Sequence, residues 1–168
     1  MAHRVALPEA VLTLGLVDGV DYCDSYACPR RVTDPPARIR DGRSADQVTA
    51  LAFGTLPTWL RQIIAGVHRH VLRLDLERPS TVPVPGWRRV HSGPDQAVYA
   101  VDGSLLAARL VVSVTPATVQ VSTLVHYERP VARIVWAGVG PIHRIITRLV
   151  LDRGVIAEGR RDADFRDS

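Results

Sequence analysis

A chain of 168 residues, of which 46% are hydrophobic and 23% charged, has the composition of one folded domain, which excludes a largely disordered protein. The net charge of +4 comes from arginines scattered along a lysine-free chain with only 5% aromatic residues, which argues against a nucleic-acid partner. The apolar patch near the start is short and interrupted by Pro8, Glu9, Gly15 and Asp18, so we expect no signal peptide and no membrane span or partner. We expect a cytoplasmic protein.

The two cysteines, Cys23 and Cys28, fall in the segment DYCDSYACP. Alternation over 20–28 predicts a strand, on which an odd separation places the two thiols on opposite faces, so we expect no disulfide between them. The sequence contains no CxxC motif, and His68 and His70 would lie about 200° apart on a helix. We therefore expect no metal and no other cofactor.

Two helices are predicted after this strand. The Pro-, Arg- and Asp-rich segment 29–44 predicts a surface loop, and Ser44 or Asp46 is the expected N-cap of a short helix over 45–54. A longer helix is predicted over 57–74, where apolar residues recur at helical spacing. Three prolines follow it and predict a connecting segment.

Four strand-like runs come next, at 86–92, 96–101, 104–114 and 118–128. Their connectors are short, and Asp102-Gly103 between two alternating runs is a strong hairpin signal, so we predict an antiparallel meander. The predicted apolar faces of the last two runs consist of Leu106, Ala108, Leu110, Val112 and Val114, and of Val119, Val121, Thr123, Val125 and Tyr127.

The C-terminal part of the sequence predicts a long helix that begins after a break. The segment 131–137 is helical or extended, the GVGP sequence at 138–141 predicts a break, and the final helix is expected over 141–153. The polar tail 156–168 is expected to fray. We predict an α+β domain over 1–155, in which a curved antiparallel sheet of five or six strands grips the C-terminal helix around a cavity.

Four segments in this order, DYCDSY, LPTWLRQII, DGSLLAARLVVSVTPATVQVSTLV and GPIHRIITRLVL, resemble an uncharacterised bacterial family. It is catalogued as a domain of unknown function, sometimes found behind a short-chain dehydrogenase-like Rossmann domain. The resemblance spans about 21–153 and implies a START-like, helix-grip fold related to polyketide cyclases and small lipophilic-ligand carriers. The residues at matching positions are Asp21, Asp24, Trp59, Arg61, Pro141 and His143.

The candidate catalytic residues are Asp24 and His143. Asp24 stands between Tyr22 and Tyr26, and if their face lines the cavity, burial should raise the pKa of its carboxyl and suit it to acid–base work. The alternative is a structural hydrogen bond from a tyrosine or an arginine. His143 would either carry a proton into the cavity or bond a carbonyl freed by the GVGP break. For a reaction, we assign Asp24 as base and His143 as acid, with Tyr22 or Tyr26 orienting the ligand.

Further ligand contacts are expected from Trp59, Arg61, Tyr99, Thr123 and Tyr127. Arg61 could instead pair with Asp24 or Asp21, and Trp59, Trp87 and Trp136 pack the core or line the pocket. The favoured function is a pocket protein for a hydrophobic, polyketide-like metabolite, acting as a cyclase, dehydratase or isomerase. The first alternative is a non-catalytic module that carries such a ligand or regulates a protein partner, and the second is a structural domain that forms a homodimer and fills its cavity with its own side chains.

Overall fold

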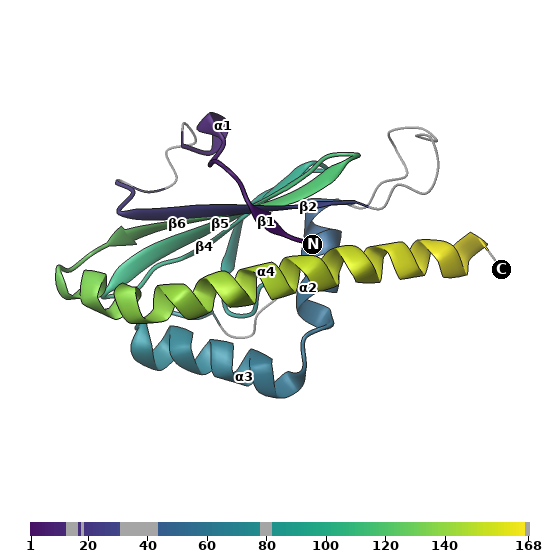
Figure 1. Ribbon diagram of the computed structural model, residues 1–168. Coiled ribbons are helices and arrows are strands. Elements are labelled where there is room, and N and C mark those ends of the chain that lie inside the picture. The colour runs from purple at the N-terminus through teal and green to yellow at the C-terminus, as the bar shows by residue number, and fades with distance from the viewer. Residues whose placement is uncertain (13–16, 18, 31–43, 78–81, 167–168) are drawn as a thin grey trace.

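The computed structural model describes residues 1–12, 17, 19–30, 44–77 and 82–166. In chain order the elements are β1 (His3–Arg4), α1 (Glu9–Leu12), β2 (Tyr22–Pro29), α2 (Ala45–Gly54), α3 (Thr58–Gly66), a π-helical turn η1 (Val67–Val71), β3 (Arg88–Ser92), β4 (Gln96–Val101), β5 (Leu106–Val114), β6 (Thr118–Tyr127) and α4 (Val131–Arg166). Figure 1 shows α2, α3 and α4 on one side of the sheet and α1 on the other. The predicted α+β fold, a sheet with a long C-terminal helix, is confirmed.

The six strands form one antiparallel sheet in the order β1-β2-β6-β5-β4-β3. The hairpin predicted at Asp102-Gly103 joins β4 to β5. A Cβ atom at Gly103 would lie 2.3 Å from the backbone oxygen of Arg73, so only glycine allows this close approach. The short strand β1, which the sequence did not predict, pairs with Tyr26 and Ala27 of β2.

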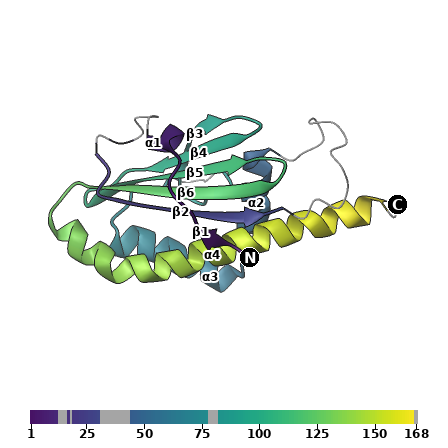
Figure 2. The same cartoon turned by 45° about the horizontal axis from the view of Figure 1, so that its top comes forward.

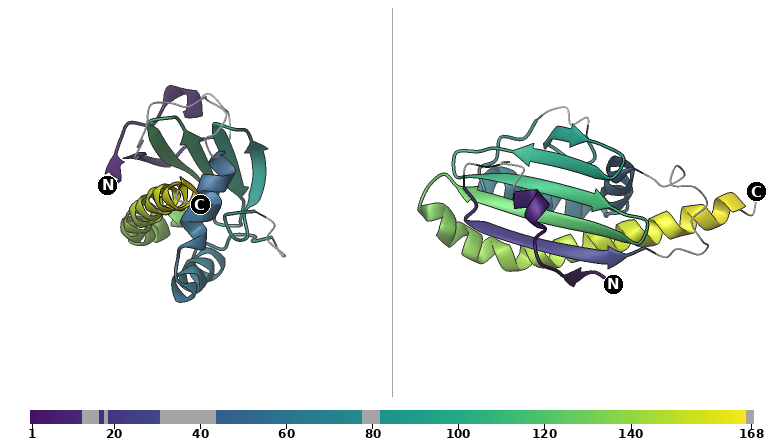
Figure 3. Two further views of the ribbon diagram at one scale, coloured as in Figure 1. Left: turned by 90° about the vertical axis from the view of Figure 1, so that its right-hand side faces the viewer. Right: turned by 90° about the horizontal axis from the view of Figure 1, so that it is seen from above.

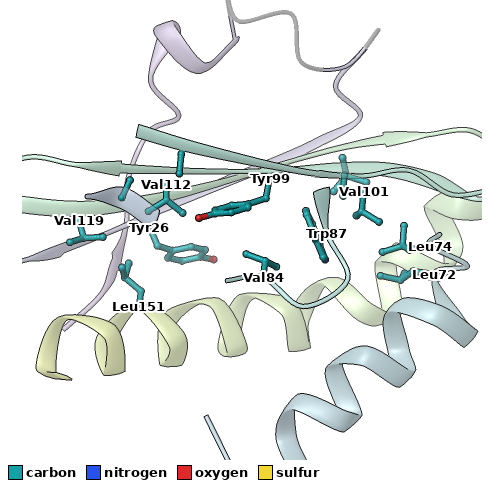
Figure 4. Close-up of a cluster of buried hydrophobic side chains, with 14 of the residues drawn as sticks. Tyr26, Leu72, Leu74, Val84, Trp87, Tyr99, Val101, Val112, Val119 and Leu151 are labelled. Carbon is teal, nitrogen blue, oxygen red and sulfur yellow. The ribbon is translucent and has the colours of Figure 1, made fainter. Parts of the chain in front are cut away.

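The helix-facing side of the sheet carries the main hydrophobic core (Figure 4). The apolar faces predicted for the two longest strands are confirmed, because their residues all pack into this core or line the cavity beside it. The opposite face carries a smaller cluster in which Val98, Val111 and Leu124 pack against Val11 of α1. The two faces follow directly from the alternation of side chains along a strand.

Helix α2 begins at a capping box in which Ser44 is the N-cap. The backbone amide of Gln47 donates to the Ser44 hydroxyl, and the Ser44 amide donates to the Gln47 side chain at 3.0 Å. Helix α2 then packs closely on α4, since a Cβ atom at Gly154 would lie 2.7 Å from that of Ala52. Figure 3 shows this crossing end-on, with α3 beside it.

The predicted break at 138–141 is wrong, because α4 runs without interruption from Val131 to Arg166 and includes Pro141. A proline inside a helix costs about 3 kcal/mol. The inward side of α4, with residues such as Ala132, Trp136 and Leu151, is buried against the rest of the protein, and this burial offsets the cost of the proline. The helix also continues through 156–166, where a frayed tail was predicted (Figure 2).

The single helix predicted over 57–74 is also interrupted. The α-helix ends at Gly66, the π-helical turn η1 follows, and the chain leaves it at Arg73, whose φ of 51° lies in the left-handed region. A π-helical turn widens the helix and often marks a functional site. Here it carries His68, which lies on the cavity wall.

Candidate functional site

A cavity of about 370 Å³ lies between the sheet and the helices α2, α3 and α4. Strands β5 and β6 form the wall on the sheet side, and Trp87 and Val84 lie at another wall of the cavity (Figure 4). This volume falls within the range of roughly 300–1,000 Å³ that is typical of small-molecule sites. The cavity that the sequence predicted between the sheet and the C-terminal helix is therefore present.

The cavity wall is almost entirely apolar. Its polar side chains, apart from two tryptophans, are Thr49, His68, Thr123, His143 and Thr147. Ile63 of α3, Val71 of η1 and Ile142 of α4 line the cavity and are also exposed to solvent. The cavity therefore opens between these helices.

The strand β2 and the helix α4 bring together the two residues that the sequence singled out. The Tyr22 hydroxyl donates to Asp24 Oδ2 at 2.6 Å, since alternation places both residues on the helix-facing side of β2. His143 Nε2 lies 3.7 Å from Asp24 Oδ1 and 3.4 Å from the hydroxyl of Thr147, one helical turn further along α4. Asp24 is fully buried behind His143, and of the two only His143 lines the cavity.

The electrostatics of this network differ from the prediction. Burial alone would raise the pKa of Asp24, but the neighbouring His143, Tyr22 and Thr123 outweigh it and hold that pKa below its usual value. Asp24 is therefore an ionised carboxylate at neutral pH, and the predicted rise in its pKa is wrong. Burial and the hydrogen bond to Asp24 raise the pKa of Tyr22 well above its usual value, so this hydroxyl remains a donor. The hydrogen bond from a tyrosine that the alternative predicted is present.

His143 is positioned as a cavity residue. Its ring lies 5.4 Å from that of Trp136, which in turn meets the Tyr22 ring edge-on at 5.1 Å. The alternative, bonding a carbonyl freed by a helix break, is wrong because α4 is not broken there. With Nε2 turned to Asp24 and Thr147, Nδ1 has no hydrogen-bonding partner among the described residues. A carboxylate on the Nε2 side of an imidazole in this way fixes the orientation of the ring.

Several buried polar atoms around the cavity lack a partner within the described part of the chain. They are Asp24 Oδ1, Thr123 Oγ1 and the indole nitrogens of Trp87 and Trp136. Buried polar groups in native proteins nearly always have partners, so each such atom needs an explanation. Three of the four belong to residues that line the cavity.

A second histidine, His68, also lines the cavity, on η1. Its ring lies 5.8 Å from that of Trp87. Burial and then the charge of His143 lower the pKa of His68 to about 4, so it is neutral at physiological pH. Sequence reasoning missed this residue, although it follows Ile64 by four positions and therefore lies on the predicted apolar stripe.

Of the predicted ligand contacts, Thr123 lines the cavity and Tyr22 holds the network behind it. The others lie outside the cavity lining: Tyr26, Tyr99, Tyr127, Trp59 and Arg61. Tyr26 is buried beneath the guanidinium of Arg148, whose carbon lies 5.0 Å from the ring centre. Tyr99 donates to Asp46, and Tyr127 lies beyond the cavity lining on β6.

Trp59 and Arg61 are both exposed on α3. Arg61 contacts the hydroxyl of Thr58 at 3.4 Å rather than Asp24 or Asp21, because it lies on the outer side of the helix. Asp21 instead accepts from the Tyr127 amide at 2.8 Å and pairs with His126. The sequence showed which side chains of β2 share a face of the sheet, but it did not show which side chains of α3 point outward.

Both cysteines are free, as predicted: Cys23 is exposed and Cys28 is buried. Within the described ranges, no group of three His, Cys, Asp or Glu side chains could hold a metal ion. Part of α4, Val131–Ala157, is long and apolar enough to cross a membrane. That is a weak indication, because core helices of soluble proteins meet the same measure.

Compared with known proteins, the chain matches no family model, no curated protein and no solved structure at a significant level. The function must therefore be argued from the cavity itself.

Proposed function

We propose that this protein binds an apolar small molecule in the cavity and that His143 transfers a proton to or from it. The observation that carries the proposal is an ionised carboxylate, Asp24, buried behind an imidazole on an otherwise apolar cavity wall. A buried carboxylate is costly, and pairing with His143 is what makes it tolerable. A polar group of the ligand would lie close to Thr123, Trp87 and Trp136 of the cavity wall.

The roles of Asp24 and His143 differ from those predicted from the sequence. His143 is the residue that would touch the ligand, and Asp24 is a positioning residue that holds the ring through its Nε2 side. A base at His143 Nδ1 would remove a proton next to a carbonyl, and the same ring would return it elsewhere. Cyclisation, dehydration and isomerisation of a polyketide-like ketone all need such a step. The resemblance to polyketide cyclases agrees with this reading, and a cytoplasmic location remains part of the proposal.

A non-catalytic carrier is the second candidate, and the apolar wall favours it because apolar contact alone would retain a ligand. The two candidates differ in whether a proton moves. A simple ketone such as 2-tetralone tests this, because base-catalysed exchange of its α-protons for deuterium can be followed by NMR without knowledge of the natural substrate.

Binding is measured first, by fluorescence of the Trp59→Phe variant, which retains Trp87 and Trp136 on the cavity wall. 2-Tetralone is expected to quench the tryptophan fluorescence of the Trp59→Phe variant. The same quenching is expected of a control that also carries Val90→Phe, on the exposed strand β3. It should be lost in Val121→Phe, since Val121 lines the cavity and is only half-buried, so that a larger ring would fill the space. Equal binding by both variants would contradict the cavity as the binding site.

Proton exchange is measured next. His143→Gln should keep most of the affinity and lose about 10²–10⁴ in exchange rate, the usual effect of removing an acid–base group. Binding with no exchange above the solvent rate in the unchanged protein would favour the carrier. Exchange that persists in His143→Gln would exclude His143 as the proton carrier.

A further inference from the structure

The outer sides of α3, η1 and α4 carry exposed apolar residues, in addition to those of the cavity. Ile134 and Ile145 of α4 are 75% and 68% exposed, and Trp59 of α3 is 61% exposed. Along α4 the exposed positions recur at helical spacing as Ile134, Gly138, Ile142, Ile145, Leu149 and Ile156. Single exposed apolar residues are common on proteins, but a continuous stripe indicates an interaction surface.

This surface surrounds the mouth of the cavity. Ile63, Val71 and Ile142 line the cavity and are 52%, 44% and 58% exposed, so the apolar interior and the apolar exterior meet there. Figures 1 and 3 show α3 and α4 side by side on the side of the molecule turned away from the sheet. The two helices therefore form one face.

All the formal side-chain charges in α3, η1 and the first part of α4, up to Leu151, are positive, whereas the rest of α4, from Asp152 on, also carries acidic residues. The segments 58–74 and 131–151 contain six arginines and not one aspartate or glutamate, although the whole chain has 17 acidic residues. The arginines are Arg61, Arg69, Arg73, Arg133, Arg144 and Arg148, of which Arg144 and Arg148 contact Tyr22 and Tyr26 of β2 and the other four are left for the outer face. The first acidic residues beyond the segments are Asp75 and Asp152.

A second copy of the chain fits this surface poorly, because pairing like faces would bring two sets of arginines together. A membrane-spanning role for α4 does not fit either, since Trp136 and Leu151 are buried against the rest of the protein. Exposed apolar side chains beside arginine match a membrane interface with anionic lipids, into which an amphipathic helix lays its apolar face.

We propose that the face formed by α3, η1 and α4 docks onto an anionic lipid bilayer with the cavity mouth toward the lipid. This replaces the expectation, drawn from the sequence, that no membrane is a partner. If the proposed ligand binding also holds, an apolar ligand could pass between bilayer and cavity without crossing water. Docking itself depends only on the outer face, so it can fail or hold independently of ligand binding.

The test is co-sedimentation of the full chain with vesicles of phosphatidylcholine alone and of phosphatidylcholine mixed with phosphatidylglycerol. Binding is expected to the mixed vesicles and to weaken with salt. The pair Ile134→Asp and Ile145→Asp should abolish it, since both residues are highly exposed and lie outside the cavity lining. Val90→Asp, a 52% exposed valine on β3, is the matched control and should bind normally.

The charge contribution is tested with Arg61→Gln and Arg133→Gln together, which should weaken binding by about tenfold or more. The matched control is Arg4→Gln with Arg88→Gln, exposed arginines on β1 and β3. The cavity-filling Val121→Phe should still bind vesicles while losing 2-tetralone, which separates this proposal from the proposed function.

Three results would overturn the docking proposal. One is no binding to the mixed vesicles, and another is equal binding to neutral and anionic vesicles. The third is a dimer in sedimentation velocity that Ile145→Asp dissociates, because a second copy would then cover this face.

Discussion

Two carboxylates on the helix side of the sheet, Asp24 and Asp46, each accept a hydrogen bond from a tyrosine, but only one of them is completely satisfied. Asp46 accepts from Tyr99 on one oxygen, and from Ser92 and Arg89 on the other, with the Arg89 contact at 2.9 Å. Asp24 accepts from Tyr22 on one oxygen, while its other oxygen accepts no hydrogen bond from the described residues and lies 3.7 Å from His143 Nε2.

The Asp46 network joins elements of the fold, whereas the Asp24 network ends at the cavity. In both pairs burial opposes ionisation, yet the surrounding donors lower the pKa of the carboxyl and the tyrosine keeps its proton. Asp46 lies on α2 and its donors come from β3 and β4, so the network ties three elements together. Around Asp24 the network stops at His143 on the cavity wall, where a ligand could complete it.

The largest effect is expected when each carboxylate is changed to an amide. Asp46→Asn should lower the free energy of unfolding by about 3 kcal/mol. Three groups donate to this side chain, and an amide has only one accepting oxygen, while its NH₂ group would face a donor. Asp24→Asn should cost only about 1 kcal/mol, since the amide oxygen can keep the Tyr22 hydrogen bond and its NH₂ can face His143. Urea denaturation measures both, and similar losses would show that the two networks do not differ in this way.

A smaller effect is expected from pH, through His68. Its folded-state pKa of about 4 lies below the ordinary value of 6.5, so below pH 6.5 the unfolded chain binds a proton that the folded chain does not. Stability should therefore fall as the pH drops from 6.5 to 4, by at most about 3 kcal/mol. Asp24 and Asp46, whose pKa values are lowered, lose their contributions only at more acidic pH.

The control for this pH dependence is His68→Gln, which should flatten the stability profile between pH 6.5 and 4. His70→Gln, on the exposed side of the same turn, should leave the profile unchanged. A slope that survives in His68→Gln would assign the proton uptake to another group.

The sequence predicted the sheet well, because strand parity and the Asp102-Gly103 turn are local signals. The same parity placed Tyr22 and Asp24 on one face and Thr123 on the cavity side. The sequence predicted the C-terminal helix but not its continuity through 138–141, since Pro141 is a local signal for a break and the packing that overrides it is long-range. Nor could it predict the pKa of Asp24, which depends on how closely His143 approaches across the fold.

The central claim, that the incomplete network marks a ligand site, is tested most directly by the three indole N–H signals in a ¹⁵N–¹H NMR spectrum. The signals are assigned with single Trp→Phe variants and followed during titration with 2-tetralone, whose carbonyl can accept a hydrogen bond. The indole signals of Trp87 and Trp136, on the cavity wall, should shift and saturate together, while that of exposed Trp59 should not move. A titration in which the Trp59 signal alone shifts, or in which none does, would contradict the account.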